Sequence, residues 1–211
     1  MKTGLLFDLD GTLLDTLEDL TDSVNHILEA NGFPVRTLDE VRRFVGNGAR
    51  RLIEKAAPPE ADVDALLSSF QSYYAAHCQI KTRPYPGIAQ ALETLGDHPL
   101  AIVSNKPDAA VKALCTRLFP GIPAMGETAS CPRKPAPDMV LRAMKELGVE
   151  RCIYIGDSEV DVQTAKNAAV PCVSVLWGFR DRKEMENAGG VCFCETPEQL
   201  PEMIMRLEHG K

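Results

Sequence analysis

Two carboxylates interrupt an apolar run close to the N-terminus. Asp8 and Asp10 stand two residues apart in the stretch LLFDLDGTLL, residues 5–14. Removing an unpaired carboxylate from water costs several kcal/mol, so a buried strand that runs into an acidic turn is unfavourable on its own. We therefore expect a cation to compensate this pair, and the further acidic residues described below make a metal ion the expected one.

Other apolar segments also lead into polar residues of matching chemistry. These residues are Ser104, Asn105 and Lys106 after one segment, Asp157 and Asp161 within GDSEVD (156–161), and Lys134 between Pro132 and Pro135. Carboxylates in this number suit a hard cation such as Mg²⁺, which takes about six oxygen ligands in octahedral geometry. A metal ion, a lysine and a hydroxyl together offset the negative charge of a phosphoryl group.

The apolar pattern predicts short strands that alternate with helices. Strands are expected at 3–7, 100–103, 152–155, 171–176 and 191–194, and helices at 88–95, 107–118, 138–147 and 161–169, with a last helix that starts at the capping box of 196–199. Strands joined by single helices favour an α/β fold with a doubly wound parallel sheet. Right-handed crossovers bring the carboxyl ends of such strands to one edge, so the polar residues should meet there.

A block without a convincing strand separates the first predicted strand from the others. Amphipathic helices are expected at 16–31, 37–45, 49–57 and 63–74, the first opened by Thr16 and Asp19 and the second by the capping box from Thr37 to Glu40. We predict a Rossmann-like core of residues 1–14 and 83–211 and an inserted helical cap of residues 15–82. Hinges would lie near residue 15 and over 81–87.

Composition restricts the partners. The chain of 211 residues has a formal net charge of −7, which would repel nucleic acid and anionic membrane surfaces at long range. No signal peptide or membrane span is visible, which predicts a cytoplasmic protein. The seven cysteines are odd in number and contain no C-x-x-C, so reduced thiols are expected. The predicted partner is a small phosphorylated metabolite, and the pattern leaves monomer and homodimer open.

The polar segments resemble the four motifs of the haloacid dehalogenase superfamily. The matching elements are Asp8-x-Asp10-x-Thr12, Ser104 after an apolar strand, Lys134, and Gly156-Asp157-x-x-x-Asp161, in the family's order. Within that superfamily the chain is similar to the phosphoglycolate phosphatase group. That likeness rests on Val45-Gly46-Asn47-Gly48-Ala49, Tyr85-Pro86-Gly87, Ser104-Asn105-Lys106-Pro107, Lys134-Pro135-x-Pro137 and Trp177-Gly178-Phe179.

The resemblance implies roles for the residues of the core. Asp8 would be the nucleophile that forms an aspartyl phosphate, and Asp10 the general acid and base. The implied metal ligands are Asp8, the Asp10 backbone carbonyl and Asp157, with Asp161 holding a metal-bound water or orienting Lys134. Ser104 and Lys134 would act on the phosphoryl group, Asn105 would help bind it, and Thr12 would shape the turn. Thr12 and Asp161 could instead only cap local structure.

The cap would select the leaving group. Asn47 and Gly48 are expected to present backbone N–H groups to the substrate, and Arg50 to bind a carboxylate or hydroxyl. A helix-breaking turn with exposed basic residues is the alternative for this segment. Glu159 and Lys106 are expected to be solvated.

Other activities share much of this pattern. A phosphomutase similar to β-phosphoglucomutase would pass the phosphoryl group to a sugar, and a pyrophosphatase or nucleotidase would differ only at the cap. A receiver-type signalling module also combines acidic residues, Mg²⁺ and a lysine, but it has no helical insertion. The expected activity is an Mg²⁺-dependent phosphatase that acts on a small phosphate monoester.

Overall fold

A six-stranded sheet forms the centre of the molecule. The computed structural model describes residues 2–209. The strands are β1 (Gly4–Phe7), β4 (Leu100–Pro107), β5 (Ala124–Glu127), β6 (Cys152–Gly156), β7 (Cys172–Val175) and β8 (Phe193–Cys194). They lie in the order β5-β4-β1-β6-β7-β8, and every pairing is parallel. The predicted α/β class with a parallel sheet is confirmed.

Helices cover both faces of this sheet because β1 is apolar on both sides. Leu5 and Phe7 belong to one buried cluster, whereas Leu6 belongs to the other. The first cluster includes residues of α5 (Ile88–Thr94), α6 (Asp108–Leu118) and α10 (Leu200–Glu208), and the second includes residues of α7 (Asp138–Leu147) and α8 (Glu159–Asn167). A strand that is buried on both faces is typical of a parallel sheet.

Most predicted elements of the core lie within a few residues of their expected positions, but several differ. Strand β4 continues to Pro107, beyond its expected end at 103. Strand β5 and helix α9 (Arg182–Asn187) were not predicted. Helix α8 begins at Glu159, two residues before the expected start. The last helix is preceded by a 3₁₀ turn, η1 (Pro197–Gln199), and the Thr196 side chain makes no capping hydrogen bond, so the predicted capping box is wrong.

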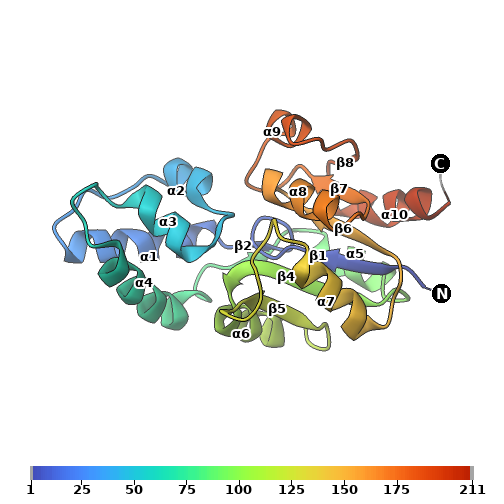
Figure 1. Ribbon diagram of the computed structural model, residues 1–211, viewed down its shortest axis with the longest axis horizontal. Coiled ribbons are helices and arrows are strands. Elements are labelled where there is room, and N and C mark those ends of the chain that lie inside the picture. The colour runs from blue at the N-terminus through green and yellow to red at the C-terminus, as the bar shows by residue number, and fades with distance from the viewer. Residues whose placement is uncertain (1, 210–211) are drawn as a thin grey trace.

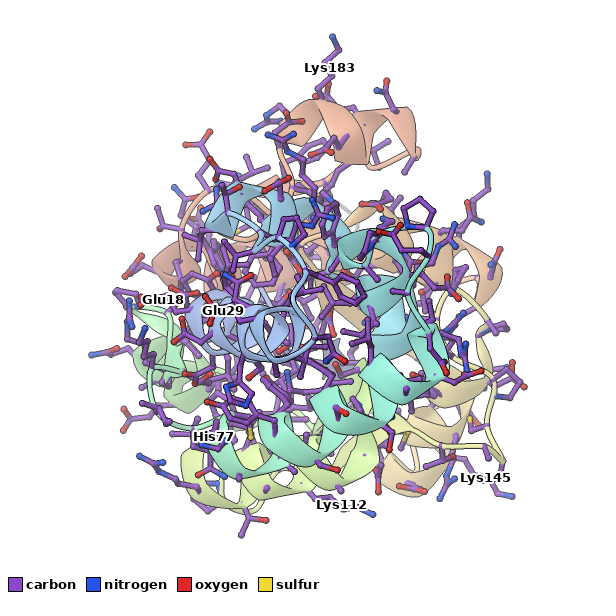
Figure 2. All side chains as sticks on the ribbon, turned by 90° about the vertical axis from the view of Figure 1, so that its left-hand side faces the viewer. Glu18, Glu29, His77, Lys112, Lys145 and Lys183 are labelled. Atoms are coloured by element: carbon purple, nitrogen blue, oxygen red, sulfur yellow. The ribbon has the colours of Figure 1, made fainter. Side chains whose placement is uncertain are left out.

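Four helices lie between the short strands β2 (Leu14–Asp15) and β3 (Arg83–Pro84), which pair with each other in antiparallel fashion. These helices are α1 (Leu17–Ala30), α2 (Leu38–Phe44), α3 (Gly48–Ala56) and α4 (Val63–His77), and we call them the cap helices. They gather on one side of the sheet in Figure 1, and their outer surface faces the viewer in Figure 2. The division into a core and a cap domain at residues 15 and 82 stays a prediction.

The two chain segments that enter and leave the cap helices are tied together by Asp19. Its carboxylate accepts hydrogen bonds from the backbone N–H groups of Lys81, at 3.0 Å, and Thr82, at 2.8 Å. The predicted role of Asp19 as a partner of Thr16 in capping is therefore wrong, and Thr16 makes no capping bond. By contrast, the capping box of Thr37 and Glu40 is confirmed.

The cysteines form no disulfides, as expected: all seven are free. No helix within residues 2–209 has both the length and the apolar character needed to cross a membrane.

Candidate active site

The polar segments that the sequence singled out meet at the carboxyl edge of the sheet. Strand β1 lies between β4 and β6, so Asp8 and Asp10 after β1 adjoin Ser104 in β4 and Asp157 after β6. The pocket at this edge is lined by Asp8, Asp10, Leu20, Val45, Gly46, Gly48, Ala49, Leu52, Phe70, Tyr74, Ser104, Asn105, Lys106, Pro107, Asp157 and Ser158. Its floor therefore comes from the sheet and its walls largely from the cap helices.

Lys134 joins two of the carboxylates. Its Nζ lies 2.8 Å from Asp8 Oδ1, 2.8 Å from Asp161 Oδ1 and 3.0 Å from the hydroxyl of Tyr154. The residue is only 2% exposed. Because the low local dielectric strengthens such charge-assisted bonds, Lys134 fixes the orientation of the Asp8 carboxylate.

Asn105 holds the backbone of Lys134 in place. The Asn105 Oδ1 accepts from the Lys134 N–H at 2.8 Å, and the Asn105 Nδ2 donates to the Lys134 carbonyl at 2.9 Å and to the Gly46 carbonyl at 3.1 Å. Both ends of the amide are thus engaged by the protein. The expected role of Asn105 as a substrate ligand does not fit these contacts, and the residue instead connects the lysine to the cap.

Asp161 is also fully engaged by protein groups. Its Oδ1 accepts from Lys134 and from the Tyr154 hydroxyl at 3.2 Å, and its Oδ2 accepts from the Ser158 N–H at 3.1 Å and the Ser158 Oγ at 2.6 Å. The carboxylate therefore both orients Lys134 and caps the start of α8. Tyr154, which joins this network from inside β6, was not predicted.

Asp157 is fixed by the turn after β1 and by the loop after β7. Thr12 Oγ1 donates to Asp157 Oδ1 at 3.2 Å, and the Phe179 N–H donates to Oδ2 at 2.7 Å. Gly11, with a φ of +84°, packs so closely against this carboxylate that a Cβ there would collide with it. Thr12 therefore positions a carboxylate, and Gly11 gives it room.

Negative charge exceeds positive charge in this cluster. The carboxylates of Asp8, Asp157 and Asp161 each offer an oxygen within 4.8 Å of the others, and the Lys134 ammonium contacts two of them, Asp8 and Asp161. Burial, followed by the charge of Asp161, raises the pKa of Asp8 to about 7, and burial raises the pKa of Asp157 well above its ordinary value. A hard divalent cation fits this set of oxygen donors because it would supply the missing positive charge.

Asp10 lies outside that cluster because its carboxylate faces Lys106. The Lys106 Nζ is 2.8 Å and 3.1 Å from the two oxygens of Asp10. Lys106 was expected to be solvated, and this is wrong, since the residue is 5% exposed. Ser104 and Lys106, both in the irregular last part of β4, line the same pocket, and the ring of Tyr74 from α4 covers the Lys106 ammonium at 4.6 Å.

The cap contributes to the pocket through one face of α3. Gly48, Ala49 and Leu52 line the pocket, which is one side of a helix with 3.6 residues per turn. Arg50 lies on another side and pairs with Asp64 of α4 at the exposed surface, so it does not line this pocket, and its expected role in substrate binding stays a prediction. Asn47 precedes α3 without lining the pocket, whereas Gly48 lines it as expected.

Arg180 connects the core to the cap and was not predicted. Its guanidinium donates to the backbone carbonyls of Arg42 at 2.8 Å and Val45 at 2.6 Å, at the end of α2, and to Glu159 at 3.0 Å. Arg180 is 7% exposed. Glu159, expected to be solvated, is partly exposed and serves as the ion-pair partner of this arginine.

Comparison with known proteins identifies relatives along nearly the whole chain. The family model described as haloacid dehalogenase-like hydrolase matches residues 5–175. A phosphoglycolate phosphatase from Agrobacterium fabrum is 39% identical, over 96% of this chain and 92% of the relative. Another from Mesorhizobium japonicum is 38% identical, over 96% of both chains.

A solved structure agrees with these matches. It is the crystal structure of a Lactobacillus delbrueckii subsp. bulgaricus protein that carries a provisional assignment as a phosphoglycolate phosphatase. It superposes with a TM-score of 0.90 at 39% sequence identity, and the alignment covers 97% of this chain and 99% of the other.

Proposed function

Because this chain belongs to the haloacid dehalogenase-like hydrolase family and is a phosphatase of that family, we propose that it hydrolyses 2-phosphoglycolate, or a phosphate monoester of similar size, with Mg²⁺. The observation that carries the proposal is the contact of Lys134 with both Asp8 and Asp161, beside Asp157, at the base of a pocket. The substrate is proposed from the relatives, which are phosphoglycolate phosphatases. The family match sets aside a receiver-type module.

The proposed metal site uses oxygens of the core. Asp8 and Asp157 would hold the ion together with the backbone carbonyl of Asp10, while Asp161 remains engaged with Lys134, Tyr154 and Ser158. When bound, Mg²⁺ would supply positive charge to the phosphoryl oxygens. The hydroxyl of Thr12 and the backbone N–H of Phe179 would keep Asp157 in position for this role.

The proposed first step forms an aspartyl phosphate. A carboxylate oxygen of Asp8 attacks phosphorus in line with the ester oxygen, so an O–P bond to Asp8 forms as the O–P bond to the leaving group breaks. Lys134 and the N–H of Leu9, 2.7 Å from Asp8 Oδ1, hold the nucleophile for this attack. Asp10 gives its proton to the departing alkoxide.

The proposed second step releases inorganic phosphate. Asp10 takes a proton from a water molecule, which attacks the phosphorus and returns Asp8 to a free carboxylate. Ser104, which lines the pocket, donates its hydroxyl to a phosphoryl oxygen, and Lys134 offsets the charge that gathers there. The cap walls limit access of bulk water to the intermediate.

A panel of phosphate esters tests the proposed function. We would measure phosphate release from 2-phosphoglycolate, glucose 6-phosphate, a nucleoside monophosphate and pyrophosphate, with Mg²⁺ and with an excess of chelator. The expected result is a kcat/KM for 2-phosphoglycolate at least about tenfold above the others, lost in chelator and restored by Mg²⁺. No release from any ester with Mg²⁺, or equal release in chelator, would contradict the proposal.

The same assay separates hydrolysis from phosphoryl transfer to a sugar. Steady release of phosphate without a sugar bisphosphate is expected of the phosphatase. A requirement for the bisphosphate, with a sugar phosphate as the product, would identify a phosphomutase instead.

A further inference from the structure

Two polar groups in the pocket are not used by the proposed chemistry. Lys106 Nζ lies beside Asp10, and the Tyr74 ring lies over that ammonium. The Tyr74 hydroxyl is buried beside Lys106 and makes no hydrogen bond of normal geometry among the described residues. A buried hydroxyl without a partner costs free energy, so this group is expected to find one when the pocket is filled.

Among the described residues that line the pocket, Lys106 is the only basic one. Lys134 lies beneath the pocket and is not part of its lining. An ammonium has three N–H donors, and Asp10 is the carboxylate that faces this one. Burial raises the pKa of Tyr74, so its phenol stays protonated and is able to donate. The corner therefore presents two adjacent donors to a ligand, which suits a group with two anionic oxygens.

We infer that Lys106 and Tyr74 bind a carboxylate on the leaving group, and that the enzyme selects phosphorylated α-hydroxy acids. This inference rests on the proposed function, in which the ester oxygen faces Asp10. In such a substrate the carboxylate carbon is two bonds from the ester oxygen, and Lys106 is 2.8 Å from Asp10. The carboxylate therefore falls within reach of the lysine and the phenol.

The rest of the pocket wall favours a small leaving group. Leu20, Val45, Leu52 and Phe70 line it with apolar side chains. Hydroxyls of a sugar placed against them would lose water without gaining a hydrogen bond, which is unfavourable. The charged corner and the apolar walls thus select for a short carboxylated group.

The test compares two substrates of similar size, 2-phosphoglycolate and 2-hydroxyethyl phosphate, which has an uncharged alcohol in place of the carboxylate. Tyr74→Phe removes only the hydroxyl, and we expect it to raise KM for 2-phosphoglycolate about five- to tenfold with a smaller change in kcat. Lys106→Met should lower the ratio of the two kcat/KM values by about 100-fold, and Lys106→Arg should retain part of the preference.

Tyr73→Phe is the matched control because the Tyr73 ring stacks between His26 and His77, away from the pocket lining. It should leave the substrate ratio unchanged. Thermal unfolding of each variant verifies that it is folded, and Tyr74→Phe with Lys106→Arg keeps the test decisive even if Lys106→Met does not fold.

Each of three outcomes would contradict a different claim. If the pocket variants lower kcat/KM for both substrates by the same factor, Lys106 and Tyr74 do not bind the carboxylate. If the native enzyme prefers 2-hydroxyethyl phosphate, the assigned substrate class is wrong although the phosphatase remains. If the native enzyme hydrolyses neither these nor any other monoester, the proposed function itself fails.

Discussion

The edge of the sheet and the cap wall differ in how completely their polar groups are paired. At the edge, Asp8, Asp157 and Asp161 each accept hydrogen bonds from fixed protein groups. On the cap wall the lining is mainly apolar, and the hydroxyl of Tyr74 has no partner in the part of the chain that the structure describes. The polar groups of the edge are therefore held in place by the protein itself, whereas the Tyr74 hydroxyl of the wall would gain its partner from the ligand that we infer.

One short segment touches both regions. Trp177 Nε1 donates to the Thr12 carbonyl at 2.9 Å, and the Phe179 N–H donates to Asp157, both at the sheet edge. The next residue, Arg180, donates to carbonyls of the cap at Arg42 and Val45. Movement of the cap would thus be transmitted to the groups that hold Asp157.

The largest effect should come from the proposed nucleophile. Asp8→Asn removes the attacking oxygen while retaining the size of the side chain, and we expect phosphate release to fall by about 10⁴-fold or more. Phosphate release is measured with Mg²⁺, and thermal unfolding serves as the control for folding. Activity within about tenfold of the native level would remove Asp8 from the role of nucleophile.

The next largest effect should come from the lysine beneath the pocket. Lys134→Met leaves Asp8 and Asp161 buried without their ammonium, so we expect the free energy of unfolding to fall by about 3–5 kcal/mol. We also expect kcat to fall by about 10²–10³-fold. Denaturant titration and steady-state kinetics measure the two effects. If Lys134→Met kept the native free energy of unfolding, the ion pairs of Lys134 would not stabilise the sheet edge, and the proposed difference from the cap wall would be wrong.

A smaller effect is expected where the two regions are joined. Arg180→Met removes the donors to the cap carbonyls and should raise KM about tenfold, because the cap then spends more time open. Hydrogen exchange of the backbone amides in α2 should rise in parallel. Arg182→Met is the control, since Arg182 pairs with Glu186 and Glu195 and lies over the Phe193 ring, all of them outside the cap helices. Equal behaviour of the two variants would contradict a cap contact specific to Arg180.

The smallest effect is expected at the outer side of α3. Arg50→Met breaks an exposed ion pair with Asp64, and such pairs contribute little. We expect kcat/KM for 2-phosphoglycolate to stay within about twofold of the native value. A fall as large as that of Tyr74→Phe would show that Arg50 reaches the substrate and would return it to the cap wall.

The meeting of the polar residues at one edge of the sheet was predictable from the sequence. Asp8, Ser104 and Asp157 follow apolar strands, and parallel topology brings such positions together whatever their separation in the chain. Strand β5 escaped prediction because it is an edge strand of four residues with only one buried position. Helix α9 is six residues long, although its capping box from Asp181 to Glu184 was a usable signal.

The contacts between the core and the cap helices were less predictable, for physical reasons that differ from residue to residue. Lys106 is a charged residue whose burial depends on a ring from α4, and it lies beyond the expected end of its strand at residue 103. Arg50 points away because of where α3 begins, which fixes the faces of that helix. Arg180 binds backbone carbonyls of residues far away in the chain, and no sequence pattern records such contacts.

The most direct measurement is detection of a phosphoryl group on Asp8. Asp10→Asn should slow hydrolysis of the intermediate, and p-nitrophenyl phosphate has a leaving group that departs without a proton from Asp10. After incubation with Mg²⁺, acid quenching and digestion, fragmentation mass spectrometry should find the mass of one phosphoryl group on Asp8. Release of p-nitrophenol without that modification, or with the phosphoryl group on another residue, would contradict the account.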